Sequence, residues 1–115
     1  MPRHKGSQRA QRYIQASILL ALKIKSSYGY ELIQEMPRFG FVEGQAPPGM
    51  IYRHLRDLEE NGLVASQWET RGTGPAKRVY QLTEEGMEAL DSWIAYMHDQ
   101  AQKLVHFVQT YRDIP

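Results

Sequence analysis

The apolar positions in the first part of the chain predict two helices of different character. Residues 10–25 carry apolar side chains on nearly every face, so this helix is expected to be covered on more than one side. A second, shorter helix is predicted over 29–36, because Ser26 and Ser27 offer N-cap side chains and Pro37 disfavours its continuation.

A third helix and a strand pair follow. The helix is predicted from Pro48 to Glu60, because proline suits a first helical position and Asn61-Gly62 provides a left-handed C-cap. Two β-prone runs come next, at 63–69 and 77–82. The residues between them, 70–76, are rich in Gly, Thr and Pro and predict the turn of a β-hairpin.

The last part of the chain predicts one long helix. Thr83 can cap it, and apolar residues then recur in alternating steps of three and four up to about Tyr111. At 1.5 Å per residue such a helix is roughly 42 Å long, which one small domain cannot cover. The surplus stripe predicts a second copy of the chain, although the helix could also fold back on its own domain. The predicted dimer interface comprises Ile14, Ile18, Ile94, Met97, Ala101, Leu104 and Val108.

Three short helices followed by a two-stranded wing are typical of a winged helix-turn-helix. The predicted fold is therefore mainly α with a small β-hairpin, ending in a long C-terminal dimerisation helix. We expect a basic N-terminal tail over 1–9, a winged helix-turn-helix DNA-binding domain over 10–82 and the dimerisation helix over 83–115.

Composition and charge narrow the classes of function. The chain has 115 residues, a formal net charge of +1 and no cysteine, which excludes a disulfide scaffold and thiol catalysis. Residues 1–12 hold four basic and no acidic side chains, a pattern equally expected of a solvated tail. The longest apolar run, 18–22, is too short to cross a membrane. A cytoplasmic protein without a membrane partner is expected.

The predicted third helix carries candidate DNA-reading side chains. On a helical wheel its aliphatic residues share one side, Arg53 and Arg56 lie opposite, and Tyr52 lies on the flank. Arginine can bind guanine or phosphate, and the second helix of a helix-turn-helix enters the major groove. Alternatively, both arginines pair with Asp57 or Glu60 on the same helix.

The predicted wing adds Arg71 at its tip and Lys77 and Arg78 on its return strand. Basic residues on a wing contact phosphate or the minor groove. The Gly-rich turn lacks the Lys-Ser/Thr ending of a phosphate-binding loop, so nucleotide binding is not expected.

The sequence gives only weak indications of metal binding, catalysis or small-molecule binding. The histidines lack metal-ligand spacing, and we predict no metal, no cofactor and no catalytic residue, hence no enzyme. Trp93, Tyr96 and Met97 on the long helix could bind a small, flat aromatic effector. The more usual role of aromatic side chains at such a position is to fill a dry subunit interface.

Four sequence blocks can be compared with known families. The blocks are ILLAL at 18–22, YGYEL at 28–32, PGMIYRHLRDLEENGLV at 48–64 and RVYQLTEEG at 78–86. Together they resemble the PadR family of bacterial transcriptional regulators, in the family's order and spacing. The chain length resembles the short subfamily with one C-terminal helix. Ile51 departs from the leucine that is more usual in the family.

The resemblance implies a dimeric repressor whose last helix packs on the partner's first helix. It places Tyr52, Arg53 and Arg56 on the recognition helix and implies that Lys77 and Arg78 touch the DNA backbone. Some members bind flat aromatic compounds at the dimer interface, one branch through a tryptophan on the last helix.

The sequence thus predicts a regulator that binds a palindromic DNA operator as a homodimer and is released by a small aromatic effector, if one exists. The alternative is a winged-helix module for protein–protein contacts that binds no DNA.

Overall fold

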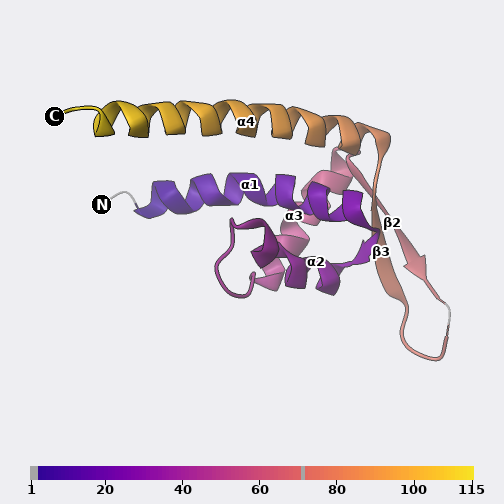
Figure 1. Cartoon of the computed structure of the whole chain (residues 1–115). Helices are drawn as coiled ribbons and strands as arrows, with labels where there is room; N and C mark the ends of the chain where they lie inside the picture. Colours follow the sequence, from indigo (N-terminus) through magenta and orange to yellow (C-terminus); the bar gives the residue numbers. More distant parts are fainter. Residues whose placement is uncertain (1–2, 71) are drawn as a thin grey trace.

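The computed structural model describes residues 3–70 and 72–115, with side chains from residue 13 onward. Arg71, a predicted DNA contact, lies outside the described residues. Figure 1 shows α1 and α4 running side by side in opposite directions, with α2 on the side of α1 away from α4 and with β2 and β3 extending from the end where α4 begins. In chain order the elements are α1 (Arg3–Ile24), β1 (Ser27–Tyr28), α2 (Gly29–Glu35), the 3-10 helix η1 (Met36–Phe39), α3 (Pro48–Glu60), β2 (Val64–Glu69), β3 (Lys77–Leu82) and α4 (Glu84–Arg112).

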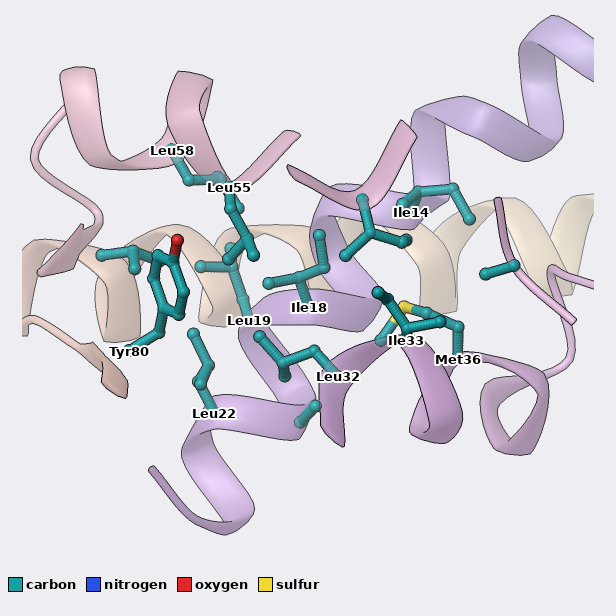
Figure 2. Packing of buried hydrophobic residues seen from close by; sticks show 14 of the residues in the cluster. Ile14, Ile18, Leu19, Leu22, Leu32, Ile33, Met36, Leu55, Leu58 and Tyr80 are labelled. Carbon is teal, nitrogen blue, oxygen red and sulfur yellow. The ribbon is translucent and has the colours of Figure 1, made fainter. Parts of the chain in front are cut away.

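The core forms around α1, which packs against α3, α4 and the sheet. Figure 2 shows its aliphatic side chains meeting Leu32 of α2, Leu55 of α3 and Tyr80 of β3. Ile18 and Leu19 are fully buried there. Elements of the same chain thus cover α1 on several sides, which explains why it is apolar on nearly every face. The helix itself begins at Arg3, earlier than the predicted start at residue 10.

The sheet has one strand more than predicted. The hairpin of β2 and β3 is confirmed, with Ser66 opposite Tyr80 and Trp68 opposite Arg78. The two-residue strand β1 pairs with the other edge of β3, giving the order β1-β3-β2. Ser27 was expected at a helix N-cap, and this prediction is wrong because Ser27 lies in β1.

Local hydrogen bonds explain where the helices of the winged domain begin and end. The backbone N–H of Tyr28, the residue before α2, donates to Glu31 Oε1 at 2.8 Å. At the end of α3, Gly62 has φ 76°, and the Leu63 N–H donates to the Leu58 carbonyl at 3.0 Å. This is a Schellman motif, as Asn61-Gly62 predicted. It turns the chain sharply from α3 into β2.

The start of α4 is anchored to the winged domain. Thr83 Oγ1 accepts from the Gly86 N–H at 3.0 Å and donates to the Gly62 carbonyl at 2.7 Å, so the predicted cap is confirmed. A Cβ at Gly86 would collide with the Leu63 carbonyl oxygen, so the helix can lie this close only with glycine there. Within the described residues, no helix is long and apolar enough to span a membrane.

Candidate nucleic-acid interface

The outer face of α3 exposes two cations. Arg53 and Arg56 are exposed, whereas Ile51, Leu55 and Leu58 on the opposite side are buried. Among the residues that the structure describes, neither arginine forms an ion pair. The expected alternative, pairing along the helix, is therefore not observed, and both guanidinium groups are available to an anionic partner.

Tyr52 occupies the flank of α3, where it packs against the start of α2. Its side chain is 41% exposed. A Cβ on Gly29 would lie only 2.5 Å from the Tyr52 ring, so glycine is what allows this close approach. The helix-turn-helix contact therefore fixes the place of a predicted DNA-binding side chain, a link that sequence spacing did not reveal.

The two described cations of the wing are engaged within the chain. Arg78 donates from one terminal nitrogen to Glu59 Oε1 at 3.1 Å and from Nε to Ser66 Oγ at 2.8 Å. Lys77 Nζ lies 5.3 Å from the Tyr28 ring centroid and 5.9 Å from that of Tyr30. These two cations thus differ from Arg53 and Arg56, because intramolecular partners hold them in place.

The Lys77 side of the sheet is a small polar and aromatic cluster. Tyr28 and Tyr30 stack with ring centroids 5.6 Å apart. The Tyr28 hydroxyl donates to Glu69 Oε1 at 2.9 Å, and this hydrogen bond raises the pKa of Tyr28 above its ordinary value. The cluster ties β1 to the hairpin.

His54 is a residue of α3 that the sequence patterns did not single out. Its Nδ1 accepts from the Gln15 amide of α1 at 3.2 Å, which places the proton of the neutral ring on Nε2. Nε2 is buried without a hydrogen-bond partner among the described residues. Burial lowers the pKa of His54, and the charge of Arg53 lowers it further.

The structure brings together two of the three predicted effector-binding residues. Trp93 and Tyr96 line a shallow, mostly apolar cavity of about 480 Å³, and their rings meet edge to face at 6.1 Å. Trp93 also touches Tyr13 of α1, with ring centroids 5.9 Å apart. Met97 instead lines a second cavity of about 260 Å³ between α1 and α4.

The predicted interface residues fall into two groups. Ile14 and Ile18 are buried in the chain's own core, so the same chain already covers their side chains. Ile94, Ala101, Leu104 and Val108 are exposed, and Met97 is half-buried. Val105 and Phe107, which the stripe omitted, are 68% and 74% exposed. The apolar surface of α4 is therefore broader than one heptad stripe.

Comparisons with known proteins agree with this geometry. The sequence profile described as "Transcriptional regulator PadR-like family" matches residues 18–92. A Mycobacterium tuberculosis protein described as a probable transcriptional regulator is 34% identical over 79 residues, which are 69% of this chain and 42% of that protein. The chain thus spans less than half the length of this relative.

Two solved structures extend the comparison. A PadR family transcriptional regulator from Eggerthella lenta is similar with a TM-score of 0.68 and 26% identity, over 81% of each chain. Bacillus subtilis PadR in complex with operator DNA is similar with a TM-score of 0.63 and 26% identity, over 72% of this chain and 47% of that one.

The fold and the site together define a winged helix-turn-helix domain of the transcription-regulator class, extended by one long helix. The chain belongs to the PadR-like family of transcriptional regulators. It is a member of a family of regulators and not of enzymes.

Proposed function

We propose that this chain is a cytoplasmic, dimeric repressor that binds a palindromic DNA operator through α3. The observation that carries the proposal is that Arg53 and Arg56 on the outer face of α3 are exposed and form no ion pair with any described residue. In a helix-turn-helix this face enters the major groove, where arginine binds guanine through two parallel hydrogen bonds. Bacillus subtilis PadR, which has a similar fold, forms a complex with operator DNA, and this supports DNA binding by the present chain.

Dimerisation is proposed from the exposed apolar side chains of α4. Leu104, Val105, Phe107 and Tyr111 are each at least 66% exposed on one helix. A contiguous apolar surface of this kind marks an interaction site, and a second copy of the same helix is the simplest partner. A two-fold dimer would present two α3 helices to successive major grooves, which matches a palindromic operator.

We also propose that a small aromatic effector binds to α4 and releases the protein from DNA. The cavity at Trp93 and Tyr96 offers aromatic faces, an indole N–H and a phenol hydroxyl to a flat aromatic molecule. Because α4 continues directly from the winged domain, a molecule seated there would change the angle between the two winged domains.

The salt dependence of duplex binding tests the function directly. We expect the logarithm of the binding constant to fall steeply and linearly with the logarithm of salt concentration, because cations on the protein displace counterions from phosphates. Arg53→Ala should cost about 1–3 kcal/mol and relax sequence preference at one position in each half-site. Arg38→Ala, which removes an exposed cation on η1, is the matched control and should leave preference unchanged.

A flat salt dependence would contradict the proposal and favour a winged-helix module for protein–protein contacts. Equal loss of affinity for every duplex in Arg53→Ala would show that Arg53 binds phosphate and does not read a base.

A further inference from the structure

One polar network joins the C-terminal end of α3 to both strands of the wing. Glu59 of α3 accepts from the Ser66 hydroxyl of β2 at 2.6 Å and from Arg78 of β3 at 3.1 Å. Arg78 Nε donates to the same Ser66 oxygen at 2.8 Å. The three side chains therefore close a ring of hydrogen bonds that spans three elements.

Aromatic rings complete the surroundings of Arg78. Its guanidinium carbon lies 5.7 Å from the ring centroids of both Trp68 and Tyr80. Trp68 is the register partner of Arg78 across the hairpin, and Tyr80 is buried in the core. The guanidinium is thus oriented by a planar fork of hydrogen bonds and by two π faces, both of which favour arginine over lysine.

We propose that Arg78 is a positioning residue for DNA binding: with Glu59 and Ser66 it fixes the angle between the wing and the recognition helix, and it does not itself neutralise a phosphate. The inference deepens the proposed function and rests on it. It also replaces the expectation that Arg78 contacts the DNA backbone, because its ring of partners lies at the C-terminal end of α3, away from Arg53.

Arg78 could either contact a phosphate or position the wing. The direction in which one charge-removing substitution changes the DNA affinity distinguishes these two roles. Glu59→Gln removes a negative charge and weakens the hold on Arg78. If Arg78 contacted phosphate, this variant would bind DNA more tightly. If Arg78 positions the wing, Glu59→Gln should bind DNA about threefold to tenfold more weakly, the factor that corresponds to the net contribution of about one ordinary hydrogen bond.

Glu60→Gln is the matched control. Glu60 is the next residue of α3, is exposed and forms no ion pair with a described residue, so its substitution removes the same charge without breaking the network. We expect unchanged or slightly tighter DNA binding in Glu60→Gln. Tighter binding in Glu59→Gln, equal to or beyond that control, would overturn the proposal.

Substitution of Arg78 itself supplies the second readout. Arg78→Lys keeps the positive charge but loses the planar fork, so it should weaken binding about as much as Glu59→Gln and leave the salt slope unchanged. A phosphate contact would survive Arg78→Lys, and Arg78→Met would then lower the slope by about one unit.

A measurement without DNA keeps this inference separate from the proposed function. In two-dimensional NMR spectra of the free protein, Glu59→Gln should shift the backbone amide signals of both β2 and β3 more than Glu60→Gln does. If the wild type binds no duplex, the proposed function fails, yet these shifts still show that the network orients the wing. Equal shifts in the two variants would show that the network does not hold it.

Discussion

The winged domain and the second half of α4 both carry apolar side chains, but only the winged domain buries them within the chain. In the winged domain, apolar side chains from every helix and from the sheet close a core within one chain, and Leu90 near the start of α4 is 3% exposed within it. From residue 101 onward every residue of α4 is exposed, including Leu104 and Phe107. One helix thus belongs to a complete core at its start and presents an uncovered apolar surface at its end.

The comparison shows that a periodic apolar pattern specifies a buried face but not the chain that buries it. Leu90 and Leu104 belong to the same predicted stripe, fourteen residues or two heptads apart. The position of α1, which packs against the first part of α4, decides that Leu90 is covered within the chain and Leu104 is not. Substitutions in the two regions should therefore change different equilibria.

The largest expected effect is on folding, at Leu90. Leu90→Ala leaves a cavity in a closed core and should lower the free energy of unfolding by about 2–5 kcal/mol. Chemical denaturation should show the loss at every protein concentration. Leu104→Ala is the matched substitution on the open surface, and its effect on unfolding should appear only at concentrations where the chain associates. Equal, concentration-independent losses in both variants would contradict the comparison.

A smaller effect is expected on association, at Leu104. Leu104→Asp places a charge in the apolar surface and should raise the dimer dissociation constant at least about 100-fold, or roughly 2.7 kcal/mol. Operator binding should weaken with it, because one winged domain then binds one half-site. Sedimentation and duplex titration measure the two effects. A monomeric Leu104→Asp protein with the wild-type affinity for DNA would contradict the claim that operator binding depends on dimerisation.

The smallest expected effect is a pH dependence confined to the winged domain. The pKa of His54 is lowered in the folded protein, so the unfolded chain takes up a proton first as the pH falls. Stability should therefore decrease as the pH drops below about 6.5, the ordinary value for histidine.

Thermal unfolding between neutral and mildly acidic pH measures this dependence. His54→Gln should reduce it. His98→Gln, on the exposed part of α4, should retain the wild-type pH dependence. A His54→Gln protein with an unaltered pH dependence would rule out His54 as the group responsible.

Elements that carry their own local signals were predictable from the sequence. The bounds of α3 were predicted correctly because Pro48 and Asn61-Gly62 mark its two ends. The strand β1 was missed because two residues show no alternation and form a strand only by pairing with the free edge of β3. Its register is set by a contact more than fifty residues away along the chain, which no local pattern contains.

The candidate DNA-binding site was likewise predictable from the sequence only in part. The exposed side of α3, with Arg53 and Arg56, follows from helical periodicity. The engagement of Arg78 could not be predicted, because Glu59 lies nineteen residues earlier and meets it only once the wing folds back on α3. The same holds for Tyr52 and Gly29, which meet across the helix-turn-helix.

Sedimentation equilibrium of the wild-type chain, measured from nanomolar to tens of micromolar concentration, tests most directly whether a second copy covers the end of α4. We predict a transition from the chain mass of 13.3 kDa to twice that mass, complete in the micromolar range. A mass of 13.3 kDa at every concentration would contradict the account, because the exposed apolar surface of α4 would then remain uncovered in solution.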